Sequence, residues 1–142
     1  MQISKILVPT DGSEAADRLY AYAMDLARLT GAAIVVMHAY NPPAALRKRG
    51  ALALDELKSS LEEEARELVG EAAQMIQAAG LTVSALVVEG APAEAILRAI
   101  EAEQPDLVVV GSRGLGGWPG AYLGSVAERV VRHAPVPVLV VK

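Results

Sequence analysis

The 142-residue sequence has no cysteine, no phenylalanine and a single tryptophan. Without cysteine there can be no disulfide framework, no thiol nucleophile and no cysteine-ligated metal. The scarcity of aromatic residues leaves an aliphatic core, and hydrophobic residues still make up 53% of the chain. This composition is typical of a folded globular protein rather than a disordered one.

Two further absences concern partners and location. The sequence has no apolar run long enough to cross a bilayer, and its first residues lack the basic and apolar segments of a signal peptide. We therefore expect a cytoplasmic protein that does not associate with membranes. Nucleic-acid binding is not expected, because the net charge is −4 and no basic stripe is present. Acidic residues concentrate between Asp55 and Glu71, a stretch that we interpret as the solvated face of a helix.

Short aliphatic runs alternate with segments of helical periodicity, a pattern that predicts an α/β fold with a parallel sheet. Strands are predicted at residues 5–8, 33–38, 83–88, 107–110 and 138–141. Helices are predicted from Ser13 to Thr30, from before Leu57 to Ala79, from Pro92 to about Glu103 and from Ser125 to His133. We expect one domain over residues 1–142, a doubly wound, open, five-stranded parallel sheet of order 3-2-1-4-5 flanked by four helices.

Helix ends and buried faces are also predicted. Ser13 is expected to cap the first helix with its side chain, and Gly80 to follow the longest helix. The residues expected on the core side are Leu19, Tyr22, Ala23, Leu26, Ala27 and Leu29 in the first helix and Leu57, Leu61, Ala65, Leu68, Ala72, Met75 and Ala79 in the longest.

Two polar loops follow predicted strands, at residues 9–13 and 111–125. In a doubly wound sheet, ligands bind beyond the carboxyl ends of the strands where the strand order reverses. The second loop holds six glycines in fifteen residues, which permits close approach of a ligand and convergence of backbone N–H groups on an anion. A helix beginning at Ser125 would add its N-terminal dipole. From the residues alone, the alternative is a surface loop in which Ser125 is an ordinary helix cap.

The spacing Gly111-x2-Gly114-x9-Gly124-Ser125 resembles the glycine signature of ATP-binding universal stress proteins. Further blocks of the chain resemble that family in the same order, at residues 6–13, 90–96, 106–114 and 137–141. The resemblance implies ATP as ligand, with Mg²⁺ or Mn²⁺ held mainly by the phosphates. It also implies a homodimer formed through the last strand, Val138 to Val141, which would otherwise be an apolar sheet edge.

The resemblance also implies positions for the nucleotide. Asp11 would lie near the ribose and phosphates, the backbone of Ala39 near the adenine, and Gly90 at the border of the site. The alternatives are a turn-capping role for Asp11, an ordinary strand end at Ala39 and a helix-entry turn at Gly90. The implied binding residues are Pro9, Thr10, Asp11, Ala39, Gly90, Val110, Gly111, Arg113, Gly114, Gly124, Ser125 and Val126.

The glycine-rich loop has no basic side chain after Arg113. Phosphate charge would therefore fall on backbone N–H groups, the divalent cation and Arg113. Trp118 and Tyr122 are expected to anchor the loop by hydrophobic packing. We interpret His38 as a packed residue at a strand end, and His133 as a cation-capable side chain at a helix C-terminus.

No grouping of base, orienting residue and nucleophile predicts a specific reaction. The leading hypothesis is an ATP-binding stress or regulatory protein with little or no turnover, whose protein partner the sequence does not identify. Two alternatives remain: a slow ATPase, and a binding protein for another adenine nucleotide such as AMP or cyclic AMP.

Overall fold

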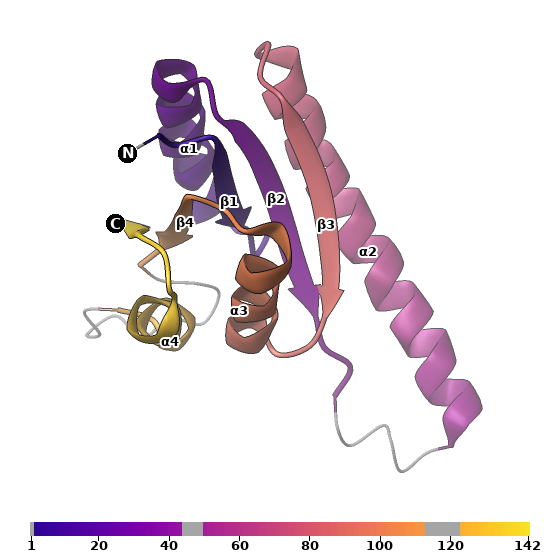
Figure 1. Cartoon of the computed structure of the whole chain (residues 1–142). Helices are drawn as coiled ribbons and strands as arrows, with labels where there is room; N and C mark the ends of the chain where they lie inside the picture. The colour runs from indigo at the N-terminus through magenta and orange to yellow at the C-terminus, as the bar shows by residue number, and fades with distance from the viewer. Residues whose placement is uncertain (1, 44–49, 113–122) are drawn as a thin grey trace.

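The computed structural model describes residues 2–43, 50–112 and 123–142, and strands and helices alternate along these ranges (Figure 1). The strands are β1 (Lys5–Pro9), β2 (Ala33–Tyr40), β3 (Val83–Glu89), β4 (Leu107–Gly111) and β5 (Val138–Val141). The helices are α1 (Ala15–Thr30), α2 (Ala51–Ala78), α3 (Pro92–Glu103) and α4 (Ser125–His133). All the strand pairs are parallel and their order is β3-β2-β1-β4-β5. This confirms the predicted fold.

Alternating side chains of the central strands supply two cores, one on each face of the sheet. Ile6 and Val8 of β1 face α1 and α2, whereas Leu7 between them faces α3 and α4. All three side chains are fully buried. Figure 1 shows α3 and α4 in front of the sheet, with α1 and α2 behind it. The strands therefore read as continuous apolar runs because helices cover both faces.

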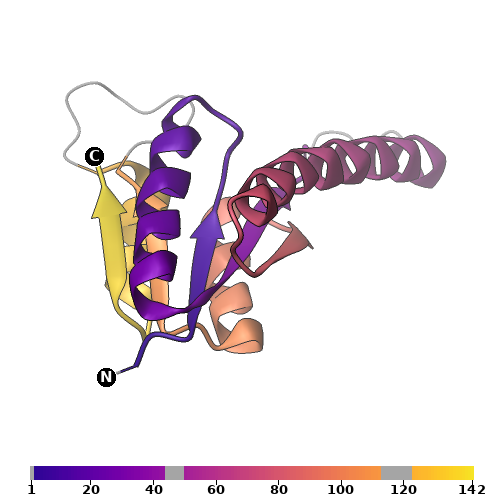
Figure 2. The same cartoon turned by 90° about the horizontal axis from the view of Figure 1, so that it is seen from above.

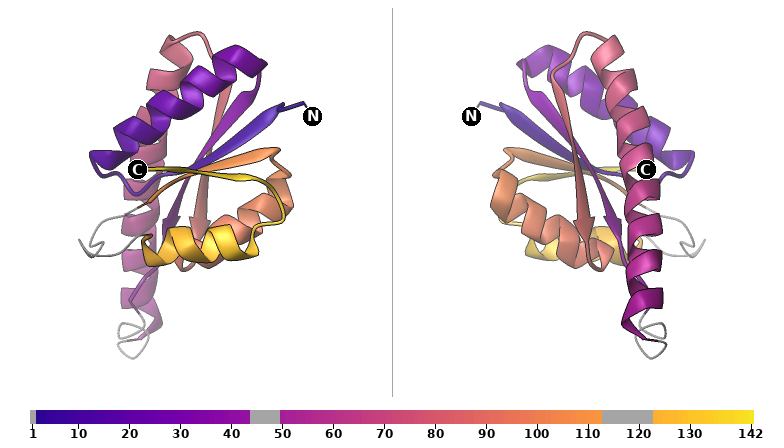
Figure 3. Two further views of the ribbon diagram at one scale, coloured as in Figure 1. Left: turned by 90° about the vertical axis from the view of Figure 1, so that its left-hand side faces the viewer. Right: turned by 90° about the vertical axis from the view of Figure 1, so that its right-hand side faces the viewer.

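Helix α2 is much longer than the sheet it covers. Its 28 residues span about 42 Å at the usual helical rise, whereas the eight residues of β2 span about 26 Å. Its buried residues are Ala65, Val69, Ala72 and Ile76, all in the second half. The first half projects beyond the sheet (Figures 2 and 3), and Leu52 there is 75% exposed. No helix in the described ranges is long and apolar enough to cross a membrane.

The buried face of α1 differs from the prediction in its phase. Tyr22 and Leu29 were expected to face the core, but they are 46% and 83% exposed. Tyr20 is buried instead, together with Ala16. The helical period locates the buried face of a helix only to within about one residue. Tyrosine is amphipathic, so Tyr20 and Tyr22 are both compatible with either the buried or the exposed side of that face's edge.

The same one-residue error occurs in α2. Met75 and Ala79 were expected to be buried and are exposed. Val69 and Ile76 occupy the core instead. The acidic residues of α2 lie mostly on its exposed surface, as predicted.

Helix ends confirm the predictions that rest on glycine and proline. Gly31 and Gly80 follow α1 and α2 with φ of 75° and 83°, and Pro92 is at the start of α3. The prediction that Ser13 caps α1 is wrong, since no side-chain cap hydrogen bond is present there. The Ser13 hydroxyl donates instead to Oδ1 of Asp11, at 2.6 Å. Glu14 occupies the N-cap position, so Ser13 lies one residue before it and its hydroxyl takes part in the turn.

Candidate functional site

The strand order reverses between β1 and β4. From β1 the chain winds outward through β2 to β3, and it then returns to the other side of β1 to form β4 and β5. Both predicted ligand loops begin here, because Pro9 ends β1 and Gly111 ends β4 at the same edge of the sheet. This is the position at which open α/β sheets bind ligands.

Thr10 is the first residue of the loop after β1, and it is only 7% exposed. Its N–H donates to the carbonyl of Met37 at 2.8 Å, which continues the pairing of β1 with β2. Its hydroxyl oxygen accepts hydrogen bonds from the Tyr20 hydroxyl and from the N–H of Gly12. Thr10 is thus fixed through both its backbone and its side chain.

Asp11 and Gly12 form the tip of this loop. Oδ1 of Asp11 accepts hydrogen bonds from the N–H and the hydroxyl of Ser13, at 2.9 and 2.6 Å. Gly12 has φ of 77°, and a Cβ at this position would lie 2.5 Å from Cδ1 of Leu68 in α2. Asp11 therefore has the turn-stabilising role given above as its alternative, and its contact with a nucleotide stays a prediction.

The segment after β4 is joined at its two described ends. The N–H of Ser112 donates to the carbonyl of Val141 at 2.8 Å, and the N–H of Gly124 donates to the carbonyl of Ser112. The second bond brings the start of α4 to the carboxyl end of β4. The predicted site residues Arg113 and Gly114 fall outside the described residues, as do Trp118 and Tyr122.

The first turn of α4 lies at this junction. Gly124 occupies the N-cap position without a side-chain cap, so the interpretation of Ser125 as the capping residue is wrong. Ser125 is instead the first helical residue, and its side chain is exposed. Its hydroxyl is therefore not used as the helix cap, while the first N–H groups of a helix lack intrahelical acceptors. Val126 and Val110 pack in the core beneath.

Ala39 and Gly90 lie farther along the same sheet edge. Ala39 is paired with Val88 near the end of β2. The N–H of Gly90 donates to the carbonyl of Tyr40 at 2.9 Å, and its φ is 145°. A Cβ at Gly90 would clash with the guanidinium of Arg98. This supports the reading of Gly90 as a helix-entry turn after β3, two strands away from β1.

The sequence reasoning missed two side chains that hold the first loop. Burial raises the pKa of Tyr20, so its phenol stays protonated and remains a donor to Thr10. Nδ1 of His38 lies 2.6 Å from the carbonyl oxygen of Thr10. Because a carbonyl only accepts, this nitrogen carries the proton. No local sequence signal pairs either Tyr20 or His38 with Thr10, because both contacts depend on how α1 and β2 pack against the loop.

Among the described residues, no group of three or more histidine, aspartate or glutamate side chains could hold a metal ion. What the described groups do offer is hydrogen-bond donors. N–H groups at the start of α4 and hydroxyl groups at Thr10 and Ser125 lie on the edge where strand order reverses. Such an arrangement suits an anionic or oxygen-rich ligand.

The chain is similar to known proteins in both sequence and fold. The sequence profile of the universal stress protein family matches residues 2–142. The chain belongs to the universal stress protein family. A universal stress protein of Thermus aquaticus is 38% identical over 143 aligned positions, covering 96% of this chain and 97% of that protein.

Solved structures of other proteins have the same fold. The structure of protein MJ0577, a universal stress protein of Methanocaldococcus jannaschii, superposes with a TM-score of 0.90 at 31% identity, covering 100% of this chain and 97% of that one. A universal stress protein in complex with cAMP superposes with a TM-score of 0.71 at 29% identity, covering 100% of this chain and 98% of the other. Membership of the family thus rests on both sequence and fold.

Proposed function

We propose that this protein is a cytoplasmic ATP-binding universal stress protein, a nucleotide-dependent regulator with little or no catalytic turnover. The observation that carries the proposal is the bond from the N–H of Gly124 to the carbonyl of Ser112. This bond brings the N-terminus of α4 to the point where the strand order reverses, beside the loop after β1. A helix N-terminus at such a point favours phosphate.

In this proposal the two loops divide the nucleotide between them. Pro9, Thr10 and Asp11 contact the ribose and phosphates from one side. From the other side come Val110 and Gly111 at the end of β4, Arg113 and Gly114 in the loop, and Gly124, Ser125 and Val126 at the start of α4. The backbone of Ala39 contacts the adenine, and Gly90 borders the site.

Mg²⁺ or Mn²⁺ would accompany ATP and be coordinated mainly by its phosphate oxygens, as is usual for Mg²⁺ in nucleotide sites. The described residues fit such a ligand through N–H and hydroxyl donors, which bind the phosphates rather than the cation. When bound, the cation would neutralise phosphate charge. This matters here because no basic residue follows Arg113 within the glycine-rich segment.

Another adenine nucleotide is the second candidate, and the relative that forms a complex with cAMP favours it. An anion-binding loop does not by itself select for a particular number of phosphate groups, so AMP or cyclic AMP would fit the same hydrogen-bond donors. Competition calorimetry with ATP, ADP, AMP and cyclic AMP separates the candidates by rank order of affinity.

We also propose that residues 1–142 act as one nucleotide-binding domain that forms a homodimer through Val138 to Val141. The position of β5 supports this proposal, because β5 is at the edge of the sheet and three of its four residues are only half-buried. Light scattering at micromolar concentration is expected to give twice the mass of one chain. The mass of a single chain would contradict the dimer.

The primary test is mass spectrometry of nucleotide released when the purified protein is denatured, together with calorimetry of the nucleotide-free protein with ATP and Mg²⁺. We expect released adenine nucleotide and saturable binding of ATP. The absence of both would overturn the proposed function. Steady-state phosphate release on the same samples is expected to be negligible, and sustained turnover would identify an ATPase instead.

A further inference from the structure

The hydroxyl of Thr10 has only one hydrogen-bonding capacity left for a ligand. A threonine hydroxyl has two acceptor lone pairs and one donor proton. Both lone pairs are occupied, by the hydroxyl of Tyr20 and by the N–H of Gly12 at 3.2 Å. The remaining capacity is the proton, so toward a ligand this hydroxyl acts as a donor.

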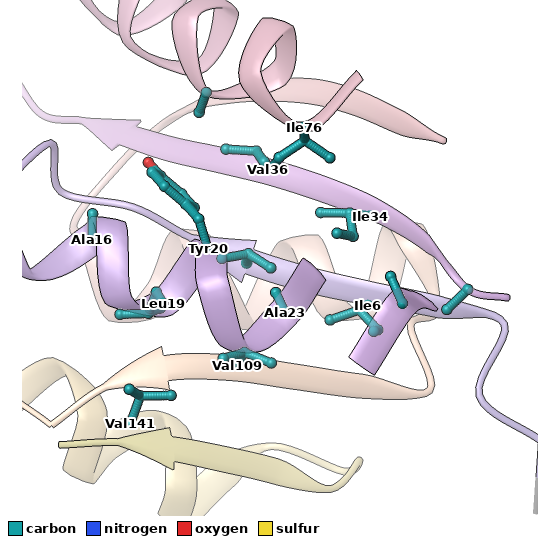
Figure 4. Packing of buried hydrophobic residues seen from close by; sticks show 14 of the residues in the cluster. Ile6, Ala16, Leu19, Tyr20, Ala23, Ile34, Val36, Ile76, Val109 and Val141 are labelled. Carbon is teal, nitrogen blue, oxygen red and sulfur yellow. The ribbon is translucent and has the colours of Figure 1, made fainter. Parts of the chain in front are cut away.

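Tyr20 is itself held firmly in place. Its ring lies within the core between the sheet and helices α1 and α2, and the residue is 7% exposed. Figure 4 shows the ring among the buried aliphatic side chains, with its oxygen at the far end from α1. Two torsions fix such a side chain, and core packing restricts both. The position of its hydroxyl oxygen beside Thr10 is therefore set by the core rather than by the loop.

The backbone of Thr10 is held in place by hydrogen bonds to β2. Its N–H bonds to Met37 and its carbonyl oxygen accepts from His38, both in β2. The backbone is thus held by β2, and the side-chain oxygen is held by Tyr20 and Gly12, which leaves the hydroxyl proton for a ligand. Thr10 lies directly after β1, at the sheet edge where the ligand is proposed to bind.

We propose that Tyr20 is a positioning residue of the nucleotide site, which acts through Thr10 by holding its hydroxyl as a donor to a ligand oxygen. The inference rests on the proposed function for the identity of the ligand. Tyr20 does not touch the nucleotide. Its role is to pre-orient one donor, which spares the ligand the cost of ordering that donor on binding.

The test compares Tyr20→Phe with Tyr22→Phe by calorimetry with ATP and Mg²⁺. Both substitutions remove one hydroxyl from α1, but Tyr22 is 46% exposed and does not belong to the core cluster that holds Tyr20. We expect Tyr20→Phe to weaken ATP binding about fivefold to tenfold, the usual effect of one hydrogen bond. Tyr22→Phe should bind as the unchanged protein does. Equal affinities for Tyr20→Phe and the unchanged protein would overturn the inference.

A double-mutant cycle separates positioning from general loss of structure. If Tyr20 acts through Thr10, Tyr20→Phe should change affinity less than about twofold in a Thr10→Val background. Thr10→Ser, which keeps the hydroxyl, should restore the sensitivity to Tyr20→Phe. Independent, multiplicative effects of Tyr20→Phe and Thr10→Val would show that Tyr20 acts by another route and would overturn the inference.

The nucleotide-free protein gives a readout that does not need ATP. The amide of Gly12 donates to the same Thr10 oxygen, so Tyr20→Phe should shift its NMR resonance and Tyr22→Phe should not. An unmoved Gly12 amide would overturn the inference. A response of the amide, combined with an unchanged protein that binds no adenine nucleotide, would contradict the proposed function and the nucleotide-binding part of this inference, but not the contact between Tyr20 and Thr10. If the protein binds ATP and Tyr20→Phe has no effect, only this inference fails.

Discussion

The loop after β1 is held by side chains of α1, α2, β2 and the loop itself, whereas the segment after β4 is joined at its described ends by main-chain bonds. Tyr20 and Leu68 contact the first loop from α1 and α2, and Asp11 closes its turn. Ser112 and Gly124 meet through an N–H and a carbonyl. The first loop should therefore respond to the loss of single polar atoms, and the second mainly to added bulk.

The largest effect is expected from Gly124→Val. Its N–H would still bond to Ser112, but a branched side chain would crowd the donors at the start of α4. We expect ATP binding to be abolished while the circular dichroism spectrum and the dimer are retained, and the same is expected of Gly114→Val. The matched control is Gly70→Val on α2, where an added Cβ meets nothing within 4 Å. ATP binding that survives both loop substitutions would show that this loop does not hold the nucleotide.

Gly12→Ala tests the steric limit of the first loop. A positive φ costs a non-glycine residue about 1–2 kcal/mol, and the contact with Leu68 adds about 1–3 kcal/mol of overpacking. We expect urea denaturation to show a loss of about 2–5 kcal/mol. In a Leu68→Ala background only the backbone part should remain. A loss of the same size in both backgrounds would contradict a role for Leu68.

Asp11→Ala removes the acceptor of two hydrogen bonds from Ser13. At about 0.5–1.5 kcal/mol for each bond, we expect urea denaturation to show a loss of about 1–3 kcal/mol. Asp25→Ala on the exposed side of α1 is the control, because its ion pair with Arg28 is solvated and worth little. Similar losses of unfolding free energy for the two variants would show that Asp11 stabilises the protein no more than an ordinary surface carboxylate does.

Ser13→Ala should have the smallest effect. It removes the hydroxyl bond to Asp11 but keeps the bond from the Ser13 N–H. We expect a loss of about 0.5–1 kcal/mol in urea denaturation and unchanged helix content by circular dichroism. A measurable loss of helix would restore Ser13 to the capping role that the sequence predicted.

Most of the fold could be predicted because apolar runs and chain breakers act locally. Gly31 and Gly80 end helices by adopting positive φ, and Pro92 starts one because it lacks the N–H that a first turn leaves unused. The alternation of strands and helices predicted the parallel, doubly wound sheet. Tyr20 could not be distinguished from Tyr22, since the choice depends on how α1 rotates against the sheet.

The candidate site was only partly predictable for a similar reason. Thr10 and Asp11 could be found because they directly follow a strand. The partners that hold Thr10 come from α1 and β2, and the sequence gives no signal that places Tyr20 and His38 against one residue. The expectation that Ser13 caps α1 failed because Glu14 takes the N-cap position. The predicted start of α4 at Ser125 is confirmed.

The projecting first half of α2 also has a hydrodynamic consequence. A helix that extends beyond its sheet raises translational friction above that of a compact sphere of the same 14.8 kDa mass. The protein should therefore elute early from a size-exclusion column and diffuse slowly, whether or not it pairs with a second copy. An elution volume would overestimate the mass of a monomer. The number of chains should therefore be determined by light scattering or sedimentation equilibrium, which measure molar mass independently of shape.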